Sequence, residues 1–178
     1  MKPLANFFKK ILLVIELAFA AAFIHWEKLL FIGVVAIDQF TKAIVMKSMV
    51  PGQSIPLVQD VFHLTYVLNP GAAFGILSNQ RGILLITGAI LILATAYFYP
   101  LLKKSDGFIR LGTTAILSGA VANLIDRVQT GYVVDFFDLR IWPVFNVADI
   151  AIVVGMGLMI YAILFRLDGA TKIDEARQ

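Results

Sequence analysis

The chain has 178 residues, of which 60% are hydrophobic and only 15% are charged, and its mean hydropathy is +0.85. This composition excludes a soluble domain, and the length suffices for several membrane-spanning segments joined by short loops. The formal net charge of +3 is modest, and basic residues lie near the ends of apolar stretches, which favours a role in membrane orientation over nucleic-acid binding.

Residues 1–27 are a basic and apolar extension before the predicted membrane domain, residues 28–168. After the basic start Met1–Lys10, the apolar run Ile11–Ile24 is shorter than the roughly 20 residues that a spanning helix needs. A further apolar run, Leu29–Ile37, follows almost at once, which argues against a cleaved signal peptide. We therefore expect the extension to be an interfacial helix or a continuation of the first spanning helix.

The first span, predicted at about residues 24–46, carries the block Asp38-Gln-Phe-Thr-Lys42 at its outer end. Asp38 and Lys42 are one helical turn apart, so they can pair across i,i+4. The simplest interpretation is a salt bridge that ends the helix. The alternative is that the pair braces a functional site without taking part in its chemistry.

Residues 49–80 form the longest stretch outside the predicted spans, and they contain a β-rich element. Val61–Leu68 is rich in β-branched and aromatic residues, which predicts a short strand or hairpin. The sequence Asn69-Pro-Gly71 follows and is a strong signal for a turn. The functional alternative is that Asn69 hydrogen-bonds the backbone of a peptide substrate, while small residues such as Gly71 let the peptide lie close.

Three further spans follow, at about residues 82–102, 108–127 and 148–166, and residues 169–178 form a tail. Four spans place both termini on one side of the membrane. That side carries ten lysines and arginines and the other side five, so the positive-inside rule predicts cytoplasmic termini and an outward-facing Asn69 loop. The predicted fold is an all-α integral membrane protein with four transmembrane helices and a small extracytoplasmic β-rich element.

The acidic residues between Lys28 and Arg166 are all aspartates, and six of the seven fall on the predicted outer side: Asp38, Asp60, Asp126, Asp135, Asp138 and Asp149. The chain has no cysteine, no Gly-x-Ser-x-Gly elbow and no histidine pair at metal-binding spacing, so the usual nucleophiles and metal ligands are missing. Two close carboxylates can share a proton, and one then deprotonates water while the other protonates the leaving group. This is aspartic-protease chemistry, which needs no cofactor.

Asn123, Asp126 and Arg127 share one face of the predicted third span, at the spacing i, i+3, i+4. The face presents an amide, an acid and a guanidinium group. Asp126 and Arg127 are most simply an ion pair or a brace at the helix end. The alternative for Arg127 is to hold a carbonyl group of a substrate.

Two aspartates stand out as a candidate pair. Asp135 follows Tyr-Val-Val and precedes two phenylalanines, surroundings that exclude water from its carboxyl group and raise its pKa. Asp149 lies near the start of the fourth span, three residues after Asn146, which is the spacing of a capping box. On the residues alone, helix capping and catalysis both remain open for Asp149.

Four blocks of the chain carry a resemblance to a known family: Asp38-Gln-Phe-Thr-Lys42, Asn69-Pro-Gly-Ala-Ala-Phe74, Asn123-Leu-Ile-Asp-Arg127 with Val133-Val-Asp-Phe136, and Phe145-Asn-Val-Ala-Asp149. In content and order they resemble the lipoprotein signal peptidases, also called type II signal peptidases. The resemblance implies a peptidase of the bacterial cytoplasmic membrane that removes signal peptides from lipid-modified prolipoproteins just before the diacylglyceryl-cysteine. The dyad of the family falls here on Asp135 and Asp149.

The resemblance also implies membrane lipid beside the site, an active site at the outer face, and inhibition by cyclic peptides of the globomycin type. We expect the substrate-binding and supporting residues to be Asn69, Gly71, Asn123, Asp126, Arg127, Asn146, Asp38 and Lys42.

Two functions of other classes compete with a peptidase. A transporter or proton channel would use the aspartates as carriers, but the carboxylates gather at one face instead of crossing the bilayer. A membrane scaffold without activity would have no need to keep both Asp135 and Asp149.

Overall fold

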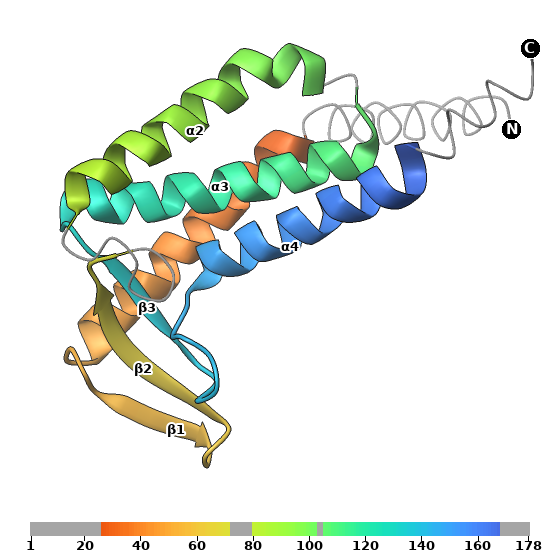
Figure 1. Ribbon diagram of the computed structural model, residues 1–178. Coiled ribbons are helices and arrows are strands. Elements are labelled where there is room, and N and C mark those ends of the chain that lie inside the picture. Colours follow the sequence, from red (N-terminus) through yellow and green to blue (C-terminus); the bar gives the residue numbers. More distant parts are fainter. Residues whose placement is uncertain (1–25, 72–79, 103–104, 168–178) are drawn as a thin grey trace, which may run out of the picture.

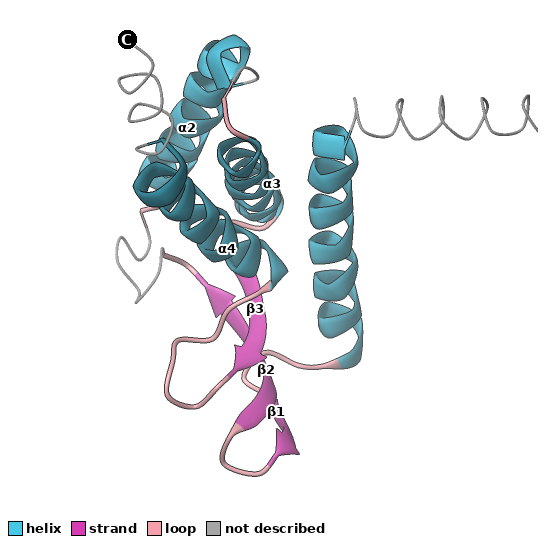
Figure 2. Ribbon diagram, turned by 90° about the vertical axis from the view of Figure 1, so that its right-hand side faces the viewer, coloured by secondary structure: helices cyan, strands magenta, loops and turns pink. Residues whose placement is uncertain are grey.

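The computed structural model describes residues 26–71, 80–102 and 105–167. Its elements, in chain order, are a first helix (Trp26–Ser48), β1 (Ser54–Val58), β2 (Phe62–Asn69), α2 (Arg81–Leu102), α3 (Gly107–Gln129), β3 (Val133–Asp138), α4 (Val147–Ala162) and the π-helical turn η2 (Ile163–Leu167). The sheet lies at one end of the group of helices (Figure 1, Figure 2). Of the predicted N-terminal extension only Trp26 and Glu27 are described, and the tail at 169–178 lies outside the described residues.

Within the described ranges, three helices are long and apolar enough to cross a membrane: Trp26–Ser48, Gly107–Gln129 and Val147–Arg166. They correspond to the first, third and fourth predicted spans. The second, α2, is a helix of 22 residues with a shorter apolar stretch, Arg81–Thr95. A mostly helical membrane protein is therefore confirmed, and α2 as a fourth span stays a prediction.

The first helix continues to Ser48, so the expectation that Asp38 and Lys42 end it is wrong. Both residues lie inside the helix and are almost fully buried, with 0% and 1% of their surface exposed. Charges inside a helix are tolerated when neighbouring elements supply partners for them, because pairing offsets much of the cost of removing them from water. The sequence of one helix alone does not show those partners.

The β-rich element is an antiparallel sheet in the order β1-β2-β3. β1 and β2 form the hairpin that the composition of Val61–Leu68 predicts. β3 was not predicted, because two aspartates interrupt its six residues and it forms a strand only by pairing with β2. One face of the β2–β3 pair packs on the first helix. There Val45 and Met49 form an apolar core with Tyr66, Val134 and Phe136.

A bulge interrupts the pairing of β2 with β3. Leu64 pairs with Phe137 and Val67 with Asp135, so β2 has one extra residue over this interval. Along β3 successive side chains alternate between the two faces. Because Val134 and Phe136 belong to the apolar core, Asp135 between them points to the opposite face, away from that core.

Small residues bring α3 and α4 into close contact. A side chain added at Gly155 would come within 2.6 Å of the backbone oxygen of Gly112, and one added at Gly119 would meet the backbone oxygen of Ala148. Glycine and alanine at such positions let membrane helices approach closely. The approach matters for function because it brings Asn123 of α3 beside the first turn of α4.

Candidate active site

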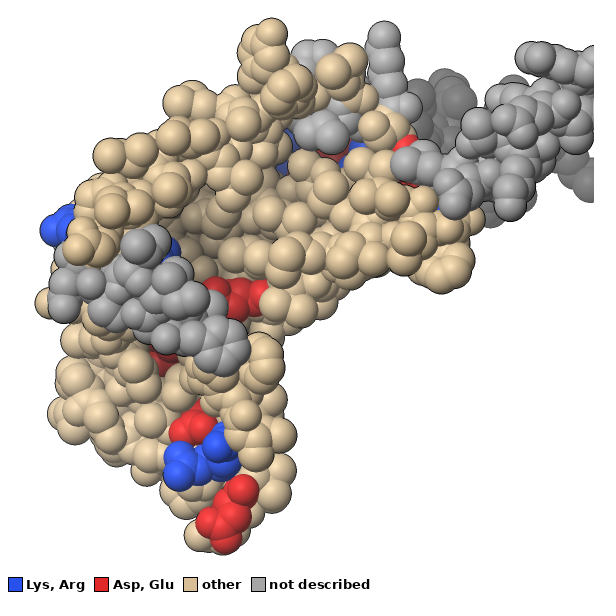
Figure 3. Space-filling model, viewed as in Figure 1, with Lys and Arg blue, Asp and Glu red and all other residues tan. Residues whose placement is uncertain are grey.

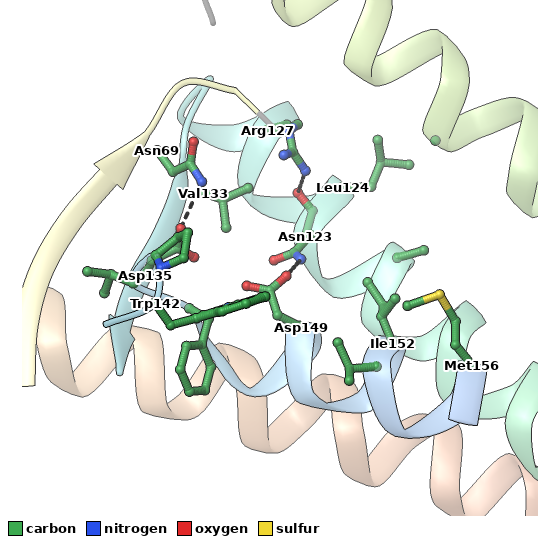
Figure 4. A pocket seen from close by; sticks show the side chains of 16 residues that line it. Asn69, Asn123, Leu124, Arg127, Val133, Asp135, Trp142, Asp149, Ile152 and Met156 are labelled. Atoms are coloured by element: carbon green, nitrogen blue, oxygen red, sulfur yellow. Dashed lines mark hydrogen bonds between the residues drawn. The ribbon is translucent and has the colours of Figure 1, made fainter. Parts of the chain in front are cut away.

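A cavity of about 390 Å³ opens between the helices and the sheet, and its polar end contains both candidate aspartates. Asn69, Asn123, Arg127, Asp135 and Asp149 converge there (Figure 4). The rest of the wall is mainly apolar and comes from α2, α3, β3, the segment before α4 and α4: Gly88, Ala120, Leu124, Val133, Trp142, Pro143, Val144, Phe145, Ile152, Val153 and Met156. In the space-filling view, acidic atoms are visible in the hollow between α2 and the sheet (Figure 3).

Asp135, in the middle of β3, is 2% exposed and accepts two hydrogen bonds from amides. Asn69 Nδ2 donates to its Oδ2 over 2.9 Å, and Asn146 Nδ2 donates to its Oδ1 over 2.7 Å. Burial, and secondarily repulsion by Asp149, raise the pKa of the Asp135 carboxyl group to about 7, although the two amide hydrogen bonds oppose the rise. The pKa rise expected from its apolar neighbours in sequence is thus found.

Asp149 is the third residue of α4 and closes a capping box with Asn146. Its backbone N–H donates to Asn146 Oδ1 over 2.9 Å, and its Oδ2 accepts from the Asn146 backbone N–H over 3.2 Å. Its other oxygen, Oδ1, accepts from Asn123 Nδ2 over 2.9 Å. The capping interpretation is confirmed, and it does not compete with a role in the site, because the capped carboxylate also lines the cavity.

Asn146 therefore contacts both aspartates. It is fully buried, its side-chain amide donates to Asp135, and its backbone N–H donates to Asp149. One residue at the start of α4 thus ties the strand that carries Asp135 to the helix that carries Asp149.

A buried ion cluster lies behind Asn123. Lys42 Nζ is 2.7 Å from Asp38 Oδ2 and 2.8 Å from Asp126 Oδ2, and it donates to Asn123 Oδ1 over 3.0 Å. Asp38 in turn accepts a hydrogen bond from the backbone N–H of Ala148 over 2.8 Å. The first helix is thereby tied to α3 and to the first turn of α4.

The ion pair expected between Asp126 and Arg127 does not form in the described structure. Asp126 instead binds Lys42, accepts from Gln39 Nε2 over 2.7 Å and accepts from the backbone N–H of Val134 over 3.2 Å. Consecutive residues of a helix point in directions about 100° apart, so Asp126 faces the first helix while Arg127 faces the cavity. Gln39 was missed, because nothing in its own sequence neighbourhood indicates a partner 87 positions away.

Arg127 holds the turn that follows β2. Its guanidinium donates to the backbone oxygen of Gly71 over 2.7 Å, and Gly71 N–H donates to Asn69 Oδ1 over 2.9 Å. The predicted turn is therefore present, and it leaves the NH₂ group of Asn69 pointing at Asp135. Arg127 lines the cavity, and its Nε is buried without a hydrogen-bond partner among the described residues.

Asp138, the last residue of β3, has a different environment from Asp135. It accepts from Thr65 Oγ1 over 2.7 Å and pairs with Arg140 over 2.9 Å. Although burial opposes it, these hydrogen bonds hold the pKa of Asp138 below its usual value. Across the described ranges, no group of three or more His, Cys, Asp or Glu side chains is arranged to hold a metal ion.

A multi-pass helical membrane protein whose polar cavity contains two carboxylates, one with a pKa near neutrality, has the features expected of a membrane-embedded hydrolase. The model of the family described as signal peptidase (SPase) II matches residues 30–165. The chain therefore belongs to the signal peptidase II family and is a peptidase.

Relatives and solved structures agree with this assignment. The lipoprotein signal peptidase of Halothermothrix orenii is 48% identical over 71% of this chain and 87% of its own, and that of Clostridioides difficile (strain 630) is 46% identical over 77% and 94%. A bacterial membrane enzyme solved by the in meso method at 2.3 Å resolution has a TM-score of 0.74 and 36% identity, over 80% of this chain and 89% of that chain.

Proposed function

We propose that Asp135 and Asp149 are the catalytic dyad with which this membrane peptidase removes signal peptides from lipid-modified prolipoproteins, just before the diacylglyceryl-cysteine. The observation that carries the proposal is their convergence: both carboxylates line one cavity, and both are hydrogen-bonded to Asn146. The family and the relatives named lipoprotein signal peptidase support the substrate class.

In the reaction, the two carboxyl groups share one proton. Because its pKa is about 7, Asp135 keeps a proton in a large fraction of molecules at neutral pH and serves as the acid. Asp149 accepts a proton from water, whose oxygen attacks the scissile carbonyl carbon. Asp135 then gives its proton to the leaving amide nitrogen, so the C–N bond breaks and one water is consumed.

The remaining polar groups of the cavity would hold the substrate backbone. Arg127 Nε is a buried donor without a partner among the described residues, and it is suited to a substrate carbonyl group. Asn69 and Asn146 keep Asp135 in place. Lys42, Asp38, Asp126 and Asn123 support the dyad from behind. The apolar wall formed by α2, α3 and α4 suits the apolar part of a signal peptide.

The protein lies in the bacterial inner membrane as a multi-pass protein. We further propose that α2 is the fourth span, that both termini are cytoplasmic, and that residues 28–168 form the membrane peptidase domain. The cavity would then open at the outer face, with the acyl chains of the substrate in the adjoining lipid. Cyclic peptides of the globomycin type would compete with the substrate for the cavity.

The experiment that tests the proposal is cleavage of a prolipoprotein by the purified full-length protein. The lipid-modified substrate should be cut before its cysteine, and the same substrate without the lipid should be cut much more slowly. If neither form is cut, or if the unmodified form is cut equally well, the proposed substrate is wrong.

A further inference from the structure

Three asparagine side chains donate to the two aspartates, and a separate contact fixes the orientation of each amide. The side-chain oxygen of Asn69 accepts from Gly71 N–H, and that of Asn146 accepts from Asp149 N–H, each over 2.9 Å. Because the oxygen of each amide is occupied in this way, its NH₂ group is the part that faces Asp135. The third amide, that of Asn123, faces Asp149.

The orientation of Asn123 depends on Lys42. An ammonium group has three donors and no acceptor. All three donors of Lys42 are engaged, with Asp38 Oδ2, Asp126 Oδ2 and Asn123 Oδ1, at 2.7, 2.8 and 3.0 Å. The oxygen of Asn123, and not its NH₂ group, must therefore face Lys42, so the NH₂ group faces Asp149.

We propose that Lys42 is a positioning residue of the dyad, which acts through Asn123: by fixing the direction of the Asn123 amide, it keeps a hydrogen-bond donor aimed at the Asp149 carboxylate. This role goes beyond the ion pair with Asp38, which would only hold helices together. It rests on the dyad proposed above. Lys42 itself is 1% exposed and acts from behind Asn123, which does line the cavity.

Loss of Lys42 removes the charged contact that constrains this amide. Asn123 could then rotate and present its oxygen to Asp149, which replaces an attraction by a repulsion. Asn146 Nδ2 also donates to Asn123 Oδ1, over 3.1 Å, but its two hydrogens serve Asp135 and the backbone oxygen of Val134 as well, at 2.7 and 3.4 Å. Lys42 makes the shorter and charged contact with Asn123 Oδ1. The Asp149 carboxylate would lose its fixed place, and small displacements of a catalytic group are costly in rate.

A double-mutant cycle separates this role from a purely structural one. Lys42→Met, Asn123→Leu and the double variant are compared with the wild type in the cleavage assay. We expect each single variant to lower kcat by about tenfold or more. For Lys42→Met the KM should change little, since Lys42 does not line the cavity. The double variant should be no slower than Asn123→Leu, because Lys42 then has no amide to hold. Lys47→Met, an exposed lysine on the same helix, is the matched control.

Losses of kcat that multiply in the double variant would overturn the proposal, as would a Lys42→Met enzyme with wild-type kcat. A second variant keeps the test valid if Lys42→Met does not fold. Asn123→Asp has nearly the shape of asparagine and leaves Lys42 in place, but it offers Asp149 an oxygen instead of a donor. It should be slower than Asn123→Leu, and a folded Asn123→Asp enzyme with wild-type kcat contradicts the proposal.

Asp149→Asn, assayed in parallel, shows which idea has failed. If Asp149→Asn stays active, the dyad itself is wrong. If it is inactive while the Lys42 and Asn123 losses multiply, only the role of Lys42 is wrong.

Discussion

The carboxylate of Asp38, on the first helix, accepts a hydrogen bond from the backbone N–H of Ala148 over 2.8 Å, across 110 positions of the chain. Ala148 is the second residue of α4, and the first N–H groups of a helix have no partner within it. A side chain from another spanning helix thus supplies part of the cap of α4. The start of α4 is also where Asn146 and Asp149 lie, so the position of the site depends on this contact.

Asp38→Ala should lower the free energy of unfolding by roughly 3–5 kcal/mol, because it leaves Lys42 with one buried partner fewer and the Ala148 N–H without an acceptor. Thermal unfolding of the purified variants in detergent measures the effect. Asp60→Asn, which changes an exposed aspartate in the turn between β1 and β2, is the control and should unfold like the wild type. Equal unfolding temperatures for Asp38→Ala and the control would refute this account of the cluster.

Gly155→Ala should separate α3 from α4, because the added methyl group would meet the Gly112 backbone oxygen at 2.6 Å, where no side-chain movement can make room. We expect a lower unfolding temperature and a lower kcat, since Asn123 and Asp149 lie on the two helices that move apart. Gly157→Ala, two positions along α4, has open space around its Cβ and should be neutral or slightly stabilising. If the two variants behave alike, close glycine packing is not what positions these helices.

Stability should fall as the pH rises from about 4 to about 7. The native Asp135 carboxyl group has a pKa of about 7, above the 3.8 of an unperturbed aspartate, so between these values the folded state binds the proton and the unfolded state does not. A raised native pKa therefore stabilises the fold only at low pH, and the contribution is lost as Asp135 ionises, by up to about 4 kcal/mol. Measuring the free energy of unfolding across this pH range tests whether stability falls as the pH rises.

Asp135→Asn is the matched variant for that measurement, since it keeps the shape and cannot ionise. Its stability should change less between pH 4 and 7, and at pH 8 it should be more stable than the wild type. If the stability of the wild type varies with pH over this interval in the same way as that of Asp135→Asn, the assignment is contradicted.

Several features of the site could be predicted from short stretches of the sequence. The apolar neighbours of Asp135 predicted its raised pKa, the spacing of Asn146 and Asp149 predicted the capping box, and Asn69-Pro-Gly71 predicted the turn. These features depend on residues a few positions apart, so a single stretch of chain contains the signal.

The features that sequence did not reveal depend on contacts between distant segments. The sequence predicted Asp38 as the partner of Lys42. The further contacts of Lys42 with Asp126 and Asn123 arise only when the first helix packs against α3. The sequence also suggested an ion pair between Asp126 and its neighbour Arg127, but the helix directs the Asp126 side chain toward Lys42 of the first helix. β3 becomes a strand only by pairing with β2, and the hydrogen bond from Asn69 to Asp135 joins these two strands.

The most direct test of the dyad is turnover of a lipid-modified prolipoprotein by Asp135→Asn, Asp149→Asn and the double variant, each shown to be folded by thermal unfolding. Each single change removes one of two groups that act as a unit, so each should lower kcat by at least about a thousandfold, and the double variant should be little slower than either. Asp138→Asn is the matched control, because the Asp138 carboxylate lies on the same strand but binds Thr65 and Arg140, and this variant should keep most of its activity. Near-normal turnover by a folded Asp135→Asn or Asp149→Asn enzyme would contradict the account.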